Sequence, residues 1–228
     1  MELNEINRLL NPAPLAMEMG YERLASGVLH VACRTDLHGV TGESFEWWFR
    51  AKPGTREYKW WHPTDHVSSE WEGTSEGTHV GLTHKVIESF AGGPQLHLKI
   101  QFAENTEFFS AAELSEAKNN GSISALICGR TSESWEPHMT PDDNIVGGRL
   151  FHVGRDTEWG MVLRSHFFIA SDLPSLGMSA SDIMELAPDV IGPGLLQHCY
   201  EEFTYLSRFL PSIFIAESGN AHSRKTPW

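Results

Sequence analysis

The chain has 228 residues, of which 40% are hydrophobic, and its 17 basic against 30 acidic residues give a net charge of −13. This balance argues against nucleic acid or an anionic membrane as a partner, because both are bound through basic patches. No apolar run approaches the roughly 18 residues of a membrane-spanning helix, and the first residues lack the pattern of a signal peptide. We therefore expect a soluble cytoplasmic protein with one domain of the larger kind.

The chain is expected to begin with a polar lead segment, residues 1–26, followed by a single domain at residues 27–215. Most predicted elements of the domain are strands, because apolar residues alternate or form short runs between turn residues. The predicted strands are 27–35, 43–51, 58–61, 78–90, 95–102, 122–130, 147–156 and 158–170.

Three helices are predicted among these strands. One short helix lies within 103–120 and another near 181–186, and a long amphipathic helix runs from about 195 to 209 and is stopped near Pro211. Residues 216–228 are expected to form a loose tail. Many antiparallel strands followed by one long helix favour an α+β fold in which a curved sheet wraps around the C-terminal helix.

The long helix carries a histidine and two glutamates that could bind a metal. His198 and Glu202 stand four apart and share one helix face, which coincides with the apolar stripe of Leu195 and Cys199. Glu201 is the competing carboxylate and points more to the side. A charged residue on a buried stripe needs a partner or a metal, although a solvated ion pair is the alternative for an isolated HxxxE pattern.

A third carboxylate follows from the strand at 78–90. Its even positions are mostly apolar, so Glu88 ends an inward-facing row. His84 lies on the same row, but four strand residues place it roughly 13 Å from Glu88, too far for both to bind one ion. We interpret His84 as a hydrogen-bonded core histidine.

The segment YKWWHPTDH, residues 58–66, sets two histidines and an aspartate among aromatic residues. Free polar side chains are costly in such a setting, so the segment resembles one corner of a metal site. Two histidines with two carboxylates are a plausible ligand set for catalytic Zn²⁺.

Several segments together resemble the 2,4-diacetylphloroglucinol hydrolase and phloretin hydrolase family. They are GVLHVACRTDLHGVTGESFEWWFRA, YKWWHPTDH, VGLTHKVIESFAGG, AENTEFF, GRLFHVGRDTEWGMVLRSHFFIA and HCYEE, in the family's order across most of residues 27–210. The resemblance implies a helix-grip fold similar to Bet v 1, with zinc in the cavity under the long helix. It also implies hydrolysis of a carbon–carbon bond between an acyl group and a polyhydroxylated aromatic ring.

The resemblance implies zinc ligands at four positions: His66, Glu88, His198 and Glu202. His62 is the alternative to His66 and could instead orient a ligand, while Asp65 is either a hydrogen-bond partner of a metal-bound imidazole or a turn residue.

The family pattern also implies roles for other residues. His152 matches a pocket histidine suited to proton transfer, against the alternative of a solvent-facing strand histidine. Tyr58 matches a tyrosine directed at phenolic hydroxyls, against simple aromatic packing, and Glu88 could share the proton transfer. Trp60 and Trp61 would help to hold the substrate. Arg164 matches a structural, salt-bridged arginine.

Departures from the family pattern, in GMVLRSHFF and at Phe167 where a tyrosine is expected, indicate a changed recognition surface. The predicted substrate is therefore a small aromatic or polyketide-like molecule of open identity. One alternative is a zinc-dependent lyase, isomerase or cyclase on the same scaffold, and another is a non-catalytic binder. The sequence does not determine the oligomeric state, for which a homodimer is one option.

Overall fold

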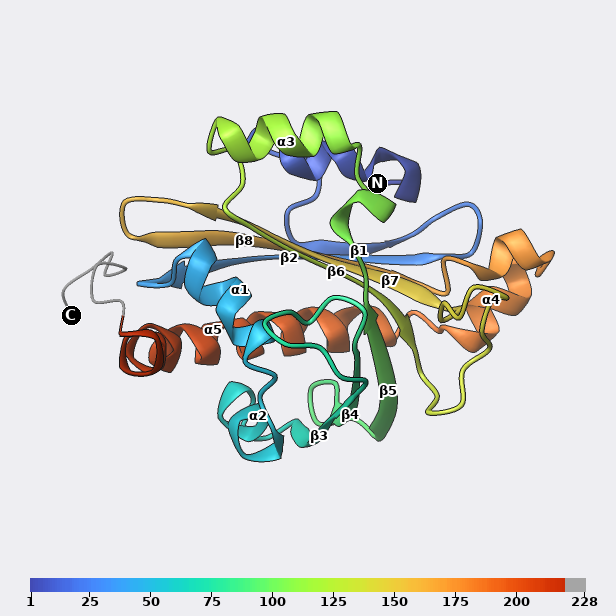
Figure 1. Ribbon diagram of the computed structural model, residues 1–228. Coiled ribbons are helices and arrows are strands. Elements are labelled where there is room, and N and C mark those ends of the chain that lie inside the picture. The colour runs from blue at the N-terminus through green and yellow to red at the C-terminus, as the bar shows by residue number, and fades with distance from the viewer. Residues whose placement is uncertain (220–228) are drawn as a thin grey trace.

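The computed structural model describes residues 1–219, and in this part of the chain eight strands form one antiparallel sheet (Figure 1). The order across the sheet is β1-β2-β8-β7-β6-β5-β4-β3. The strands are β1 (Gly20–Arg23), β2 (Leu29–His38), β3 (His66–Glu72), β4 (Thr83–Ser89), β5 (Gln95–Phe102), β6 (Ala125–Ser132), β7 (Gly148–Asp156) and β8 (Gly160–Ile169).

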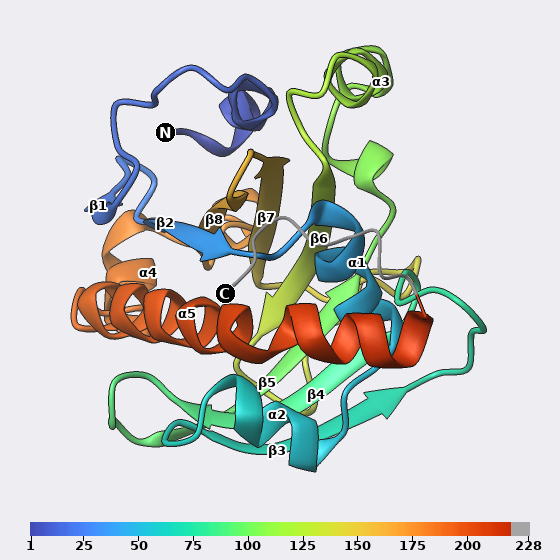
Figure 2. The same ribbon diagram turned by 90° about the vertical axis from the view of Figure 1, so that its left-hand side faces the viewer.

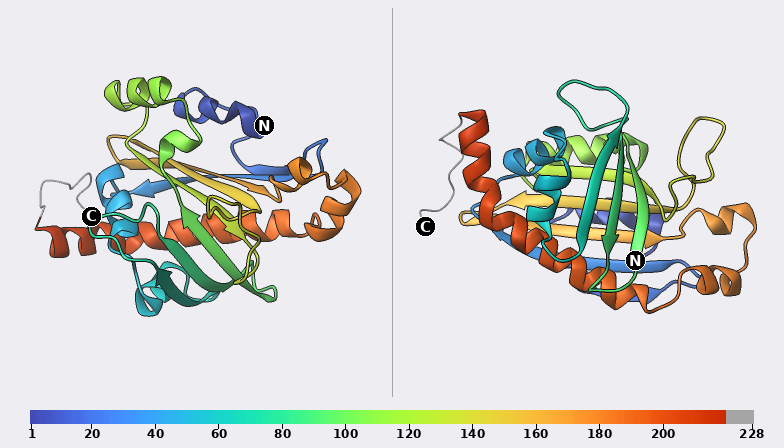
Figure 3. Two further views of the ribbon diagram at one scale, coloured as in Figure 1. Left: turned by 45° about the vertical axis from the view of Figure 1, so that its right-hand side comes forward. Right: turned by 90° about the horizontal axis from the view of Figure 1, so that it is seen from below.

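One face of the sheet is covered by the long C-terminal helix α5 (Ile191–Ser218), which lies along the sheet while the strands curl around it (Figures 2 and 3). The short helices α1 (Gly42–Arg50) and α2 (Thr55–Trp61) pack beside α5. Between helix and sheet lies the main core, with buried Phe45, Trp48, Phe203 and Leu206 at its centre. The predicted fold, a curved antiparallel sheet gripping a C-terminal helix, is confirmed.

The opposite face is covered by the 3₁₀ helix η1 (Leu3–Leu10) and by α3 (Ala111–Asn119), which enclose a second, smaller core (Figure 1). The short elements η2 (Asn105–Glu107), η3 (Leu173–Leu176) and α4 (Ala180–Leu186) complete the described chain. Arg164 fixes the first segment to the sheet, since its guanidinium donates to Glu18 at 2.7 Å and to the carbonyl of Asn11 at 2.7 Å. The structural, salt-bridged role expected for Arg164 is confirmed.

The strands predicted at 43–51 and 58–61 are wrong, because residues 43–50 lie in helix α1 and residues 58–61 lie in helix α2. In α1 the Thr41 hydroxyl accepts the Ser44 amide hydrogen, an N-cap that sets the helix start. The buried Phe45, Trp48 and Phe49 then follow at helical rather than alternating spacing.

The long helix does not stop near Pro211, as the sequence suggested, but continues to Ser218. Proline removes one backbone hydrogen bond, yet packing can outweigh this loss, and the residues beyond Pro211 do pack: Phe214 is buried and contacts Trp47 edge-on. Two strands, β1 and β3, were not predicted, and β1 joins the lead segment to the sheet. Of the predicted tail, residues 220–228 lie outside the described residues. Within residues 1–219, no helix has the length and apolarity needed to cross a membrane.

Candidate active site

Three elements bring the predicted ligands together under α5. His66 is the first residue of β3 and is the pairing partner of Glu88 on the neighbouring strand β4. His198 and Glu202 project from α5 one turn apart. The His66 Nε2 atom lies 3.3 Å from His198 Nε2, 3.6 Å from Glu88 Oε2 and 3.8 Å from Glu202 Oε2. All four side chains are buried.

Hydrogen bonds fix which nitrogen of each imidazole carries the proton. His66 Nδ1 lies 2.8 Å from the carbonyl oxygen of Tyr58, and His198 Nδ1 lies 3.2 Å from Asp65 Oδ2. Both partners only accept, so each Nδ1 must donate, and in the neutral ring each Nε2 carries the free lone pair. Two such lone pairs at 3.3 Å repel unless a proton or a cation lies between them. This pair of imidazoles fits a metal ion.

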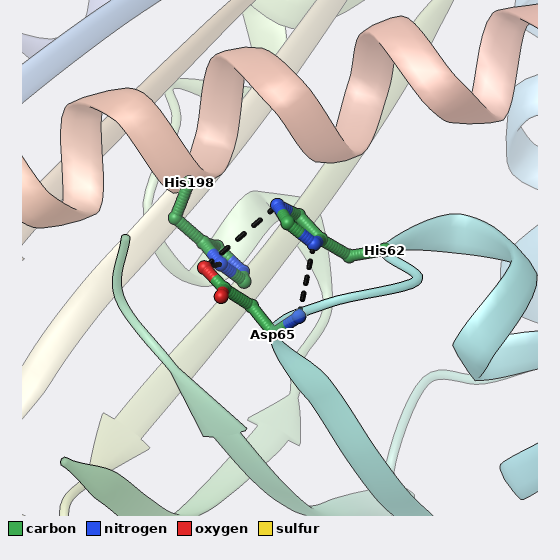
Figure 4. A group of neighbouring side chains, drawn as sticks. All are labelled: His62, Asp65 and His198. Atoms are coloured by element: carbon green, nitrogen blue, oxygen red, sulfur yellow. Dashed lines mark hydrogen bonds and ion pairs between the residues drawn. The ribbon is translucent and has the colours of Figure 1, made fainter. Parts of the chain in front are cut away.

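His62 is held in the opposite tautomer. Its Nδ1 accepts the Asp65 backbone amide hydrogen at 3.2 Å, so in the neutral ring the proton sits on Nε2 (Figure 4). Nε2 lies 3.3 Å from Glu201 Oε2 and has no well-aligned hydrogen-bond partner among the described residues. Although His62, Asp65 and His198 also form a cluster with metal-ligand spacing, a protonated Nε2 cannot bind a metal.

The carboxylates give the site a negative field in a region shielded from water. Burial raises the pKa of Glu88, and it raises that of Glu202 well above its usual value. Burial alone would lower the pKa of His198, but the hydrogen bond from its ring to Asp65 and the charges of Glu88 and Glu202 raise it to about 9. The site thus stabilises a positive charge at His198. Glu201, with a side chain 37% exposed, lies outside this group.

Tyr58 packs as an aromatic residue, and its hydroxyl binds Glu88. Its ring stacks on His66 with the centroids 3.7 Å apart, and its hydroxyl donates to Glu88 Oε2. Because that hydroxyl is committed to Glu88, Tyr58 positions two of the predicted ligands. Burial and the neighbouring Glu88 raise its pKa well above the usual value, so the phenol keeps its proton.

His152 is buried rather than solvent-facing, which removes the alternative reading of this strand residue. Its Nδ1 lies 2.8 Å from the Ser165 hydroxyl, and burial lowers its pKa to about 3, so the imidazole is neutral at physiological pH. His84 is a buried histidine whose Nε2 lies 2.7 Å from the Ser69 hydroxyl, as expected for a core residue.

Three of the four ligand positions, Glu88, His198 and Glu202, line a small cavity together with His152 and Tyr58, and a second cavity adjoins it. The small cavity has a volume of about 60 Å³, and the larger one, of about 500 Å³, begins beside Glu88. Trp61 lines the small cavity, but Trp60 is 43% exposed and borders neither, so its expected contact with substrate is wrong. The sequence also missed Phe49, whose place in the small cavity depends on α1 being a helix.

Residues 1–215 match the family described as "DAPG hydrolase PhiG domain". The chain belongs to this family. A 2,4-diacetylphloroglucinol hydrolase from Pseudomonas sp is 27% identical over 93% of this chain and 76% of that protein. The phloretin hydrolase of Eubacterium ramulus is 26% identical over 87% of this chain and 72% of that protein. Among solved structures, norcoclaurine synthase from Thalictrum flavum matches 78% of this chain and 84% of that chain at 12% identity, with a TM-score of 0.42.

Proposed function

We propose that this member of the DAPG hydrolase family is a zinc-dependent hydrolase that cleaves a carbon–carbon bond between an acyl group and a phenolic or polyketide-like ring. The observation that carries the proposal is the pair of His66 and His198 Nε2 atoms, which lie 3.3 Å apart beside the buried carboxylates of Glu88 and Glu202. In both rings the Nδ1 atom is already engaged by a hydrogen-bond acceptor, so Nε2 is the nitrogen available to a metal. The names of the relatives, 2,4-diacetylphloroglucinol hydrolase and phloretin hydrolase, support the same reaction class.

His66, Glu88, His198 and Glu202 would hold the zinc, which when bound polarises a carbonyl oxygen and lowers the pKa of water toward neutrality. Protein groups behind these residues fix their orientation. Asp65 accepts from the His198 ring at 3.2 Å, and the Tyr58 carbonyl accepts from the His66 ring at 2.8 Å. Removal of such hydrogen-bond partners typically weakens metal affinity by about 10- to 100-fold.

His152 is the residue we assign to proton transfer. It borders the small cavity, and its Nδ1 contacts a Ser165 hydroxyl that can either donate or accept. The imidazole can therefore present either a proton or a lone pair to the substrate at Nε2. In the proposed reaction the ring carbon that bears the acyl group gains a proton, water adds to the acyl carbonyl carbon, and the carbon–carbon bond breaks. The ring leaves as a stabilised enol and the acyl group leaves as an acid.

The polar residues of the small cavity would bind the reacting ketone. Tyr58, Glu88 and His152 line it together with the rings of Phe49, Phe102 and Phe167. Apolar surroundings of this kind strengthen the charge interactions made beside them.

Incubation of the zinc-loaded protein with 2,4-diacetylphloroglucinol in oxygen-18 water tests this function. Hydrolysis gives acetate with one solvent oxygen and a ring product that has lost the acetyl group. The matched control is the variant His198→Ala, which should release no acetate. A single product of unchanged mass and without label would refute hydrolysis and favour a cyclase or isomerase on the same scaffold.

A further inference from the structure

The larger cavity continues the small one away from the predicted ligands. Both are bordered by Glu88, Ile100, Leu150, Phe167 and Leu195, so a molecule whose ketone lies beside Glu88 can extend directly into the larger space. About 60 Å³ at the ligands admits only a small group, whereas about 500 Å³ beyond them is the size of a site for a whole small molecule. Most of the bulk of a substrate must therefore lie in the larger cavity.

The walls that β5, β8 and α5 give to the larger cavity offer no hydrogen-bonding side chain. They are formed by Leu96, Leu98, Ile100, Phe167, Ile169 and Ile191. Hydrogen-bonding side chains line the cavity at the end of β6 and in the loop that follows it, at Thr131, Ser132, Ser134 and His138. A hydroxyl group buried against the apolar walls would lose its hydrogen bonds to water without replacement. A ring with several hydroxyl groups fits this part of the cavity poorly, whereas an alkyl chain or a plain aryl group fits it well.

The mouth of the cavity adds a charge preference. Glu133 and Glu136 line it and are exposed, which disfavours an anionic ligand. Leu186 also lines the cavity and is 59% exposed, so part of the exposed lining is apolar. Exposed apolar residues at a cavity mouth suit the entry of a neutral apolar group.

We propose that the substrate of this protein is a neutral ketone with a long, unhydroxylated apolar substituent that fills the larger cavity. The inference rests on the proposed function for the chemistry at the ketone. The apolar walls supply the binding energy, because each methylene moved from water into them is favourable.

Binding can be measured without turnover, through quenching of tryptophan fluorescence by the alkyl phenyl ketones from acetophenone to octanophenone. We expect the dissociation constant to fall by roughly two- to fourfold for each added methylene until the cavity is full. A dissociation constant that does not change with chain length would overturn the proposal.

The variant Leu98→Trp places an indole in the larger cavity, which Leu98 borders while not bordering the small one. It should weaken octanophenone binding at least tenfold and leave acetophenone binding unchanged. The control Gln95→Trp adds the same side chain at an exposed position on the same strand and should change neither. Equal binding of octanophenone to Leu98→Trp and to wild type would show that the chain does not enter this cavity.

Release of acetate from 2,4-diacetylphloroglucinol separates this inference from the proposed function. If chain-length-dependent binding is found and no acylated phenol is cleaved, the cavity assignment stands and the hydrolase falls. If acetate is released while binding is independent of chain length, the proposed hydrolase activity is supported and the proposal of an apolar substituent is refuted.

Discussion

Exchanging each of two adjacent glutamates on α5 for glutamine separates a buried metal ligand from a surface carboxylate. Glu202 is buried beside His66 and its pKa is raised well above the usual value by burial, whereas the Glu201 side chain is 37% exposed. Glutamine keeps the size of glutamate and removes the charge. In the zinc-free protein Glu202→Gln should therefore preserve or raise stability, because it removes a charge that is costly to bury.

Added zinc should reverse that order. A ligand that binds only the folded state at a free concentration 1,000-fold above its dissociation constant stabilises it by about 4 kcal/mol, which for a protein of this size is roughly 8 to 16 °C in Tm. Wild type and Glu201→Gln should show this rise, and Glu202→Gln should lose most of it. Calorimetry in a zinc buffer, together with metal analysis, measures the effect. A full zinc-dependent rise in Glu202→Gln, with loss in Glu201→Gln, would refute the assignment.

Three further predictions follow from the tautomers and burial of the histidines. His66→Ala should abolish zinc binding, because it removes a ligand. His62→Ala should weaken zinc binding by only about 10- to 100-fold, because a proton occupies the Nε2 atom of His62 and this residue can only support the ligands. Metal analysis in which the two effects are exchanged would disprove this. His152→Ala should keep zinc and fold but lose on the order of 10² to 10⁴ in turnover of any substrate found, the usual range for a general acid or base, and undiminished kcat would exclude His152 from proton transfer. Burial lowers the pKa of His84 from 6.5 to about 3, so between these pH values the histidine is protonated in the unfolded state and neutral in the folded state. The stability due to this neutral histidine is complete above pH 6.5 and is lost toward pH 3. His84→Gln should thus flatten the pH dependence of the unfolding free energy by up to about 1.4 kcal/mol per pH unit between these limits, and parallel urea-unfolding curves across this range would contradict the reasoning.

Local sequence patterns were enough for the elements that have one dominant period. Alternation at 95–102 and apolar runs at 147–156 and 158–170 correspond to β5, β7 and β8 within a residue or two. They failed at 43–51 and 58–61, where clustered aromatics resemble a strand. There the Thr41 cap and the packing of Phe45 and Trp48 against α5 decide for a helix, and such packing is not visible in a short window.

The candidate site shows the same division. Spacing on one helix face was sufficient to prefer Glu202 to Glu201, because a helix fixes which residues share a face, and the structure buries Glu202. The alternation of apolar residues in the strand likewise predicted that Glu88 faces the core. No spacing could choose between His62 and His66, since both lie in one short segment and both are buried.

Only the tertiary structure supplies what distinguishes the two histidines. The Tyr58 carbonyl accepts a hydrogen bond from His66 Nδ1, so the lone pair of the neutral His66 ring is on Nε2. The Asp65 amide donates to His62 Nδ1, so the proton of the neutral His62 ring is on Nε2. The sequence by itself determined the family, the strand-and-helix framework and the residue types at the site. The tautomers of His62 and His66 depend on hydrogen bonds within residues 58–66, whose geometry is set by the folding of this segment into α2 and β3. The burial of the carboxylates and the apolar cavity depend on contacts between segments distant in the chain, so only the folded molecule decides them.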